Sequence, residues 1–289
     1  MTKWSADDIP DQSGRTILVT GANSGLGLES ARALVAHGAR VLMACRNPER
    51  GEAAMVEVAK VGSAAGGTAE LVVLDLTDLG SVRRAATEVR DRTGDRLDVL
   101  LNNAGVMATP LRRTADGFEG QLAANHLGHA ALTWLLMPAL RNSPGARVVS
   151  VSSLLHQRGG LDLADLNYEH RQYSAWGAYS QSKIANLLFA FELDRRARAA
   201  GLDLVSAAAH PGLSDTELTA NMIRSRGGNL VAGAVGKLGG LFAQPASAGA
   251  LPQLYAATAP GVAGGDYYGP SGFREMRGEP NRVRASKQA

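Results

Sequence analysis

The amino-acid sequence predicts an α/β fold, in which a doubly wound parallel sheet carries helices on both faces and forms one three-layer domain. Two observations predict this fold. Apolar runs alternate with segments of helical period along the chain, and polar residues directly follow several of the runs. The length of 289 residues suits a single domain, whose core we expect at about 14–272.

Six apolar runs have the length and composition of buried strands. They lie at 16–20, 40–44, 71–74, 97–101, 147–151 and 204–209. Helical segments separate the runs. Their 3.6-residue period is clearest at Val82, Ala85, Ala86 and Val89. Ligands of such sheets bind beyond the carboxyl ends of the strands, so we expect the site beside the polar residues there. These are Asp75, Asn102, Ser152 and His210.

The first run leads into a glycine turn at 21–27, which a helical segment follows. Glycines let the backbone turn tightly and approach a pyrophosphate, whose charge is stabilised by the N–H groups at the helix start. The spacing is T-G-x-x-x-G-x-G instead of the G-x-G-x-x-G of many dinucleotide-binding proteins. The turn therefore predicts a phosphate-binding site.

The end of the second run bears on the choice of cofactor. NAD-binding sites place an acidic residue there to hold the ribose 2′-hydroxyl, whereas an Arg suits the 2′-phosphate of NADP. This chain has Cys45 and Arg46 at that point. We therefore expect NADP(H) in preference to NAD(H), although a surface Arg that begins a loop would give the same pattern.

Tyr179 and Lys183 are four residues apart in a segment without Pro or Gly up to Gly201, so they share one face of a predicted helix. A free phenol has a pKa of about 10. A neighbouring ammonium group favours the phenolate and lowers that pKa, which would let Tyr179 act as a general acid or base. A solvated helix face with the same two residues is the alternative for the pair alone.

Composition argues against several classes of function. The chain has 30 Lys and Arg against 27 Asp and Glu, so we expect no nucleic-acid partner. Basic residues gather in 273–289, which we expect to be a solvated C-terminal tail.

Eighteen consecutive apolar residues occur nowhere, so we expect no membrane span. Cys45 is the single cysteine, which excludes an internal disulfide and suggests a reducing, cytoplasmic location.

Two other kinds of site also lack support in the sequence. His126 and His129 are three apart on a predicted helix, but no carboxylate or cysteine pattern completes a metal site around them. We therefore expect no metal. The chain has no G-x-S-x-G motif, which argues against an α/β-hydrolase.

The segment 213–245 is predicted as a lid, because its Gly-rich part at 227–240 is interleaved with apolar residues. The apolar side chains suggest a hydrophobic substrate, but packing of the lid on the core would need them equally. They are Leu213, Leu218, Met222, Ile223, Leu241 and Phe242.

In this order and combination, the motifs resemble those of the short-chain dehydrogenase/reductase family over about 16–272. The resemblance implies a Rossmann-type fold and a nicotinamide cofactor. It adds a motif at 102–105, similar to one that steadies the central sheet, and a segment at 210–216, similar to one that holds the nicotinamide carboxamide. The cofactor-binding residues implied are Gly21, Asn23, Ser24, Gly25, Leu26, Gly27, Arg46, Asp75, Leu76, Asn103, Ala104, Gly105, Tyr179, Lys183, Pro211, Gly212 and Thr216.

The resemblance also implies a catalytic set, which is Asn125, Ser153, Tyr179 and Lys183. Hydride would pass between the nicotinamide and a hydrophobic alcohol, aldehyde or ketone, while Tyr179 exchanges a proton with the substrate oxygen. Ser153 would hold that oxygen. Lys183 would keep Tyr179 acidic and bind the nicotinamide ribose, and Asn125 would position a water that leads to solvent.

Several features resemble the retinol-dehydrogenase-like branch of the family. They are Ala44-Cys45-Arg46-Asn47, Asn125-His126-Leu127-Gly128-His129, His156, the insert 161–178 and Ser182-Lys183-Ile184-Ala185-Asn186. Related enzymes pair the Asn125 and Tyr179 helices across a two-fold axis. Both helices are apolar over a wide arc here, so we expect a homodimer or homotetramer.

Two alternatives share parts of these motifs. A non-catalytic sensor that binds NADP needs the glycine turn, but such sensors usually lack the Tyr and Lys. A sugar-nucleotide epimerase or dehydratase shares the Tyr and Lys, but it normally needs a longer substrate domain than this chain offers. We therefore expect an enzyme that acts on CH–OH or C=O groups.

Overall fold

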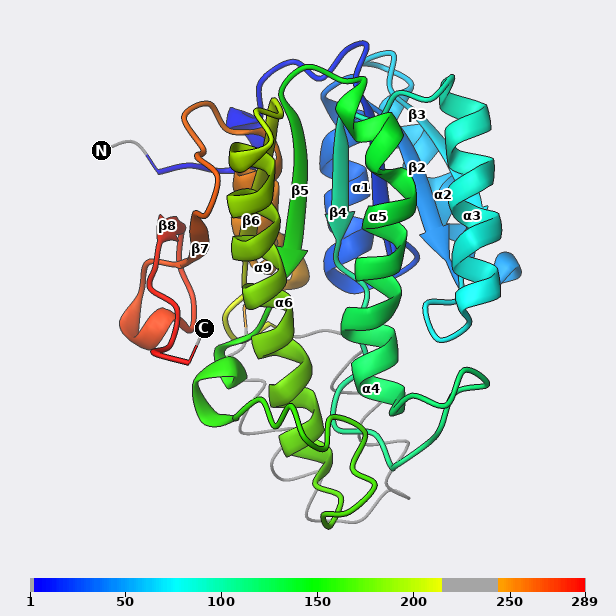
Figure 1. The fold of residues 1–289 in the computed structure, drawn as a ribbon. Coiled ribbons are helices and arrows are strands. Elements are labelled where there is room, and N and C mark those ends of the chain that lie inside the picture. The colour runs from blue at the N-terminus through cyan, green and yellow to red at the C-terminus, as the bar shows by residue number, and fades with distance from the viewer. Residues whose placement is uncertain (1–2, 215–243, 289) are drawn as a thin grey trace.

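The computed structural model describes residues 3–214 and 244–288 of the chain. Its strands are β1 Thr16–Thr20, β2 Arg40–Cys45, β3 Thr68–Val73, β4 Val99–Asn102, β5 Ala146–Val151, β6 Leu204–Ala209, β7 Tyr267–Pro270 and β8 Pro280–Arg282. They form one sheet in the order β3-β2-β1-β4-β5-β6-β7-β8 (Figure 1). All neighbours are parallel except β7 and β8. The order reverses between β1 and β4, which confirms the doubly wound sheet.

Helices cover both faces of this sheet (Figure 1). The longer ones are α1 Gly25–Ala36, α2 Pro48–Gly62, α3 Leu79–Thr93, α5 Gly128–Arg141, α6 Ala175–Ala199 and α9 Ala246–Thr258. Short helical turns are η1 Ala6–Asp8, α4 Gly120–Leu122, η2 Ala123–Leu127, η3 Leu154–Arg158 and η4 Phe273–Glu275. Helices α1, α2 and α9 pack on one face, and α3, α5 and α6 pack on the other. The three layers are those that the sequence predicts.

The alternation of side chains in β1 explains why the strands read as unbroken apolar runs. Ile17 and Val19 point into one apolar cluster, whereas Leu18 between them points into the other. All three are at most 1% exposed. A parallel strand that is covered on both faces has no solvent side, so every position is apolar.

Strand β3 begins at Thr68, three residues before the predicted run. The added residues are less apolar because β3 is the edge strand of the sheet, with one neighbour only. Glu70 lies there and forms an ion pair with Arg40 at 2.7 Å. Hydrophobicity alone could not identify this part of the strand, because polar pairing stabilises it.

The basic residues of the segment 273–289 are exposed, as the sequence predicts, but the segment also makes contacts with the folded domain as far as residue 286. Strand β8 pairs with β7 in antiparallel orientation. Val283 and Ala285 pack against a cluster that contains Leu187 of α6. Arg282 forms an ion pair with the buried Asp266, which accounts for one of the basic residues.

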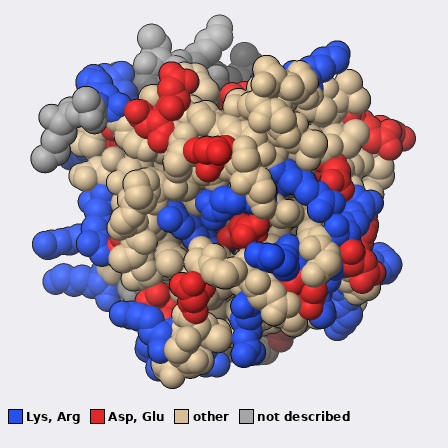
Figure 2. Space-filling view, turned by 90° about the horizontal axis from the view of Figure 1, so that it is seen from above, with Lys and Arg blue, Asp and Glu red and all other residues tan. Residues whose placement is uncertain are grey.

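The predicted lid, 213–245, lies outside the described residues except for 213, 214, 244 and 245. Within the described ranges, no helix has both the length and the apolar character that a membrane crossing needs. The strands point their carboxyl ends toward the bottom of Figure 1. On the opposite end of the molecule, basic and acidic side chains are interleaved (Figure 2).

Candidate functional site

A cavity of about 590 Å³ lies at the carboxyl ends of β1 to β4. Most of the predicted cofactor residues come together in its wall. These are Gly21, Asn23, Ser24, Gly25, Leu26, Gly27, Arg46, Asp75, Leu76, Asn103, Ala104 and Gly105. The cavity sits where the strand order reverses, which is where such sheets bind their ligands.

The glycine turn needs its glycines for two different reasons. Gly21 has a φ of +67°, a backbone conformation that other residues rarely adopt. A side chain at Gly27 would place its Cβ 2.3 Å from the carbonyl oxygen of Gly21. The turn is therefore too tight for any other residue at 27.

The chemistry at the start of α1 fits an anion. In this fully described helix, Ser24 makes no capping hydrogen bond through its side chain, and the first turn contains no acidic residue. The first N–H groups of a helix have no partner within the helix and carry partial positive charge. They lie at the cavity wall, so the pyrophosphate of a dinucleotide would fit there.

A second basic residue, Arg50, lines the cavity beside Arg46. Sequence reasoning missed it, although Arg46 and Arg50 are one helical turn apart in sequence. Asn47 caps α2 by accepting a hydrogen bond from the Arg50 N–H at 2.8 Å, and Pro48 follows it. An Asn-Pro pair is a helix-start signal, and it could have shown that position 50 is on the first turn.

The motif at 102–105 is tied to the glycine turn by hydrogen bonds. The side chain of Asn103 donates to the carbonyl of Thr20 at 2.7 Å and accepts from Gln253 at 3.1 Å. Asp75, which also lines the cavity, accepts from both the N–H and the hydroxyl of Thr77. The Asn103 bonds hold one wall of the cavity to β1 and α9, and the Asp75 bonds shape the loop after β3 that forms another wall.

The structure also brings the predicted catalytic residues together. Ser153 is the residue before η3, and its hydroxyl lies near enough to the Tyr179 phenol to lower that group's pKa. Lys183 is 4% exposed, and its ammonium group donates to the Val151 carbonyl at 3.0 Å. A side chain at Gly105 would place its Cβ 3.5 Å from Lys183 Nζ and 3.2 Å from Asn125 Oδ1. Lys183 and Asn125 therefore lie directly behind the Gly105 wall of the cavity.

Burial raises the pKa of Tyr179 above its ordinary value of about 10, and the hydrogen bond with Ser153 partly opposes the rise. This direction differs from the one expected from the spacing of Tyr179 and Lys183. The phenol is 5% exposed, and its loss of hydration disfavours the phenolate. Lys183 Nζ lies 5.7 Å from the centre of the Tyr179 ring.

Asn125 occupies an unusual turn between α4 and α5. Residues Ala123–Leu127 form a π-helical turn, η2, in which the Gly128 N–H donates to the carbonyl of Ala123, five residues back. The Asn125 side chain accepts from the Val106 N–H at 2.7 Å and donates to Ser182 Oγ at 2.9 Å. Wide turns of this kind are frequent at functional sites.

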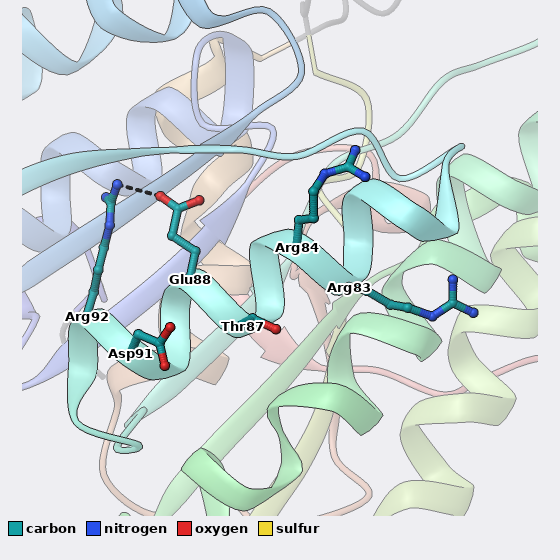
Figure 3. Close-up of a pocket in the computed structure, with 6 residues that line it drawn as sticks. All are labelled: Arg83, Arg84, Thr87, Glu88, Asp91 and Arg92. Carbon is teal, nitrogen blue, oxygen red and sulfur yellow. Dashed lines mark ion pairs between the residues drawn. The ribbon is translucent and has the colours of Figure 1, made fainter.

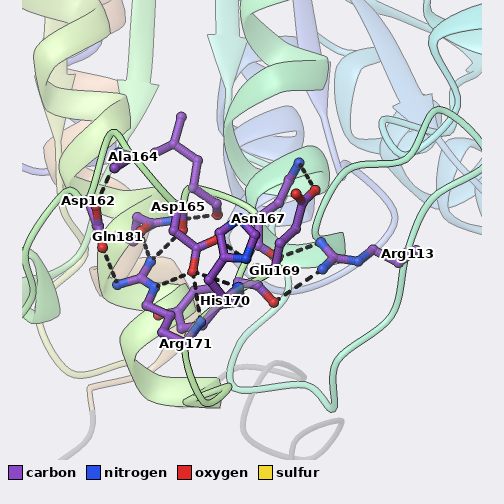
Figure 4. Close-up of polar contacts among 11 residues, drawn as sticks. Arg113, Asp162, Ala164, Asp165, Asn167, Glu169, His170, Arg171 and Gln181 are labelled. Carbon is purple, nitrogen blue, oxygen red and sulfur yellow. Dashed lines mark hydrogen bonds and ion pairs between the residues drawn. The ribbon is translucent and has the colours of Figure 1, made fainter.

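The insert that precedes α6 is held to it by hydrogen bonds (Figure 4). Asp165 accepts hydrogen bonds from the N–H groups of 169, 170 and 171, which fixes a tight loop. Arg171 donates to Gln181 Oε1 at 2.6 Å, and Gln181 donates back to the carbonyl of Leu166 at 2.8 Å. Gln181 lies between Tyr179 and Lys183, so the insert fixes α6 at the turn that carries these two residues.

Arg113 joins this insert to the cavity wall (Figure 4). It lines the cavity and donates to the carbonyls of Asn167 and Tyr168. The loop that carries Arg113 also contributes Thr109, Pro110, Arg112 and Thr114 to the wall. Sequence reasoning missed this loop, because only its tertiary contacts bring it over the site.

Pro211 and Gly212 follow β6, and the C-terminal segment holds them in place. Leu213 donates its N–H to the carbonyl of Met276 at 2.7 Å. His210 is buried and lies 3.0 Å from the Glu275 carboxylate. A Cβ at Gly212 would lie 2.4 Å from the Met276 carbonyl oxygen, so this contact requires glycine. Thr216 lies outside the described residues.

A second depression, of about 500 Å³, follows the outer face of α3 (Figure 3). Every residue that lines it belongs to this one helix, and Arg92 and Glu88 there form an ion pair. Polar groups from separate elements do not converge on it, unlike the cavity at the strand ends. We therefore assign the functional site to the larger cavity.

The two histidines of the Asn125 helix have separate partners. His126 Nδ1 lies 3.2 Å from Asn186 Oδ1, and His129 contacts Thr20 and the Asn125 carbonyl. Among the described residues, no group of three His, Cys, Asp or Glu side chains could hold a metal ion.

The fold and the cavity define a dinucleotide-binding α/β protein. The family model for short chain dehydrogenase matches residues 15–227. The chain therefore belongs to the short chain dehydrogenase family, as its motifs predict. This family comprises oxidoreductases that use a nicotinamide cofactor.

Known relatives support the predicted branch. The chain is 42% identical to human retinol dehydrogenase 13 over 205 residues, which cover 71% of this chain and 60% of that protein. It is 41% identical to human retinol dehydrogenase 14 over 273 residues, covering 89% and 78%. Mouse polyprenol dehydrogenase is 41% identical over 261 residues, covering 89% and 75%.

Solved structures agree with the fold. A protein of unassigned function from Mycobacterium paratuberculosis is 42% identical, with a TM-score of 0.79 over 99% of this chain and 91% of that chain. A short chain dehydrogenase from Burkholderia cenocepacia in complex with NADP has a TM-score of 0.66 at 24% identity, over 89% and 96%. The second similarity concerns the fold alone.

Lys183 gives a prediction about stability and pH. Burial lowers its pKa from 10.5 to about 8, so between these pH values the unfolded chain binds more protons than the folded one. Stability then rises with pH in this window. We compare the free energy of unfolding of the wild type with that of the Lys183→Met variant. We expect the difference between them to change in favour of the wild type by up to about 3 kcal/mol as the pH rises from 8 to 10.5.

Chemical denaturation of both proteins at several pH values measures this difference. The variant is the matched control, because all other titrating groups remain. A constant difference across the window would contradict the low pKa of Lys183.

Proposed function

We propose that the protein is an NADP(H)-dependent oxidoreductase that transfers hydride between the nicotinamide and a hydrophobic alcohol or carbonyl compound. The observation that carries the proposal is the position of the buried Lys183 behind the Gly105 wall of the cavity, with Tyr179 beside it. The Ser153 hydroxyl lies near the Tyr179 phenol and comes from another part of the chain. A merely structural role would not require a hydroxyl, a phenol and a buried ammonium group together.

The nicotinamide supplies or accepts the hydride when the cofactor is bound. The protein supplies the proton and orients the reacting groups. In reduction, Tyr179 gives its proton to the substrate oxygen as negative charge develops there, and Ser153 holds the same oxygen through its hydroxyl. Both groups act on charge that appears in the transition state, which is where stabilisation increases the rate.

Lys183 and Asn125 serve the proton that Tyr179 exchanges. The raised pKa of Tyr179 makes the phenol a poor acid by itself. The Lys183 ammonium group beside it would stabilise the phenolate that forms when the proton leaves. Asn125, in the π-helical turn, would position a water that connects Lys183 to solvent and so restores the proton.

The preference for NADP(H) over NAD(H) rests on Arg46 at the end of β2. Arg46 and Arg50 both line the cavity, and both side chains are exposed. A guanidinium group is well suited to a phosphate, because it offers several donors in one plane. Cys45 replaces the acidic residue that would hold an NAD ribose, and its side chain is buried.

The substrate class follows from the relatives and from the apolar residues of the predicted lid. Retinol and polyprenol, in the names of the relatives, are long apolar alcohols. We propose an alcohol, aldehyde or ketone of the same apolar character. The cytoplasmic location stays a prediction from the cysteine count.

The sensor and the epimerase remain the alternatives. A sensor would bind NADP without turnover, and the presence of both Tyr179 and Lys183 argues against it. An epimerase or dehydratase would share Tyr179 and Lys183 but would act on a sugar nucleotide.

Tyr179→Phe separates an enzyme from a sensor. The variant keeps the ring but loses the transferable proton, so we expect kcat to fall by about 10²- to 10⁴-fold with little change in NADPH affinity. An NADPH-oxidation assay over aldehydes, ketones and quinones, beginning with retinal, measures turnover. Equal turnover by variant and wild type would exclude the proposed role of Tyr179.

Arg46→Ala tests the cofactor preference. Loss of a charge-assisted hydrogen bond should weaken NADPH binding by about tenfold or more, and NADH binding should stay unchanged. Fluorescence titration with each cofactor gives the two dissociation constants. Arg83→Ala on the outer face of α3 is the matched control. If NADH binds the wild type as tightly as NADPH does, Arg46 has no such role.

We also propose a homodimer through α5 and α6. Trp134 of α5 is 48% exposed, and its ring packs edge-on against Phe189 of α6 with centroids 6.4 Å apart. We expect size-exclusion with light scattering to give at least twice the mass of one chain. Trp134→Glu should produce monomer, and Leu163→Glu, at an exposed site of the insert, should not. A monomeric wild type would refute the interface.

A further inference from the structure

His129, in the first turn of α5, lies between the cofactor turn and the catalytic set. It is 3% exposed. Its Nδ1 is 3.0 Å from the carbonyl oxygen of Asn125, and its Nε2 is 2.8 Å from the hydroxyl oxygen of Thr20. Thr20 immediately precedes Gly21, so one side chain contacts both regions.

Hydrogen-bond chemistry fixes the protonation of this ring. A carbonyl oxygen can only accept, so Nδ1 carries the hydrogen and donates it to Asn125. Burial lowers the pKa of His129 to about 3, so the ring is neutral and Nε2 is an acceptor. The Thr20 hydroxyl therefore donates to Nε2.

The Thr20 hydroxyl has four partners. Its oxygen accepts from the N–H groups of Asn103 and Ala104, each at 3.0 Å. Its hydrogen has two possible acceptors, of which His129 Nε2 at 2.8 Å is nearer than the Leu101 carbonyl at 3.4 Å. Asn103 and Ala104 line the cavity, as Gly21 does, so the hydroxyl joins the glycine turn to the opposite wall, and His129 directs its hydrogen as the nearer acceptor.

On the other side, Asn125 leads to the catalytic helix. Its side chain donates to Ser182 Oγ at 2.9 Å, and Ser182 donates to the carbonyl of Tyr179 at 2.7 Å. Hydrogen bonds therefore run without a break from Thr20 through His129, Asn125 and Ser182 to Tyr179. Buried networks of this kind hold one arrangement when every member is satisfied.

We propose that His129 is a positioning residue that sets the cofactor turn through Nε2 and the Asn125 turn through Nδ1, so that the cofactor and Tyr179 keep one relative position. The catalytic half of this proposal, through Nδ1 and the Asn125 turn, rests on the proposed function. The cofactor half, through Nε2 and the cofactor turn, concerns NADPH binding and can be tested even if the protein has no turnover.

Two amide variants separate the two halves. The short side-chain amide of His129→Asn reaches the position of Nδ1 and can still donate to the Asn125 carbonyl, but it cannot reach Thr20. The longer amide of His129→Gln reaches the position of Nε2 and can accept from Thr20, but it removes the side-chain donor of the Asn125 carbonyl. His129→Leu removes both bonds.

We expect His129→Asn to weaken NADPH binding about tenfold with kcat within about twofold of wild type, because the Thr20 hydroxyl loses its nearer acceptor. His129→Gln should show the reverse, with kcat reduced about tenfold and NADPH affinity retained. His129→Leu should show both losses. Fluorescence titration gives the affinity, and NADPH oxidation with an aldehyde gives kcat.

Thr258→Val is the control for a loss of stability alone. Thr258 is buried at the end of α9, and its hydroxyl donates to the carbonyl of Leu254 at 2.7 Å. This variant should lower the melting temperature, but it should not reduce NADPH affinity or kcat while leaving the other unchanged. If His129→Asn and His129→Gln change both quantities in parallel, or neither, the inference is overturned.

Thr20→Val guards against His129 variants that fail to fold. It removes the hydroxyl while keeping the shape, and it should reproduce the weakened NADPH binding of His129→Asn. Unchanged binding would overturn the cofactor half. If wild type and Tyr179→Phe both lack turnover, the proposed function fails, while the NADPH titrations still decide this half.

Discussion

A parallel sheet that is buried on both faces meets water only at the ends of its strands. Polar groups that are buried beneath the cavity must therefore find hydrogen-bond partners inside the protein. The glycine turn, the Asn103 turn and the π-helical turn of Asn125 all meet at the carboxyl edge of this sheet. Thr20, at the end of β1, satisfies N–H groups of the second turn and donates to His129 beside the third. The need to satisfy these buried groups therefore holds the three turns in place relative to one another.

Burial also shifts the pKa values of Tyr179 and Lys183. Removing Tyr179 from water raises its pKa, and removing Lys183 from water lowers its own, so each shift reduces the charge that the site carries. Spacing along a helix predicts that the two residues meet, but it cannot predict how deeply they are buried. Because one pKa unit corresponds to about 1.4 kcal/mol, depth of burial competes directly with the attraction between a phenolate and an ammonium group.

The parts of the structure that the sequence predicts are those set by local chemistry. Strand β1 and the turn after it are encoded by an apolar run and by glycines that no other residue can replace. The position of Arg50 on the first turn of α2 could also have been predicted from local sequence, because Asn47 and Pro48 mark the start of that helix. The loop at 109–114 was not, because Arg113 holds it by bonds to carbonyls more than fifty residues away.

Charge predicts the exposure of the C-terminal basic residues, but it does not predict the contacts of the segment that carries them. Arg282 pairs with a buried carboxylate, and the N–H of Ser286 donates to His156 beside the Ser153 turn. Glu275 and Met276 hold the segment after β6. Residues near the end of the chain thus brace two segments of the predicted site.

Helix α6 is braced separately, by the insert at Gln181 and by Asn125 at Ser182. Independent supports of this kind suit a reaction whose groups must keep fixed distances, because a displacement of about 1 Å can lower a rate about 100-fold.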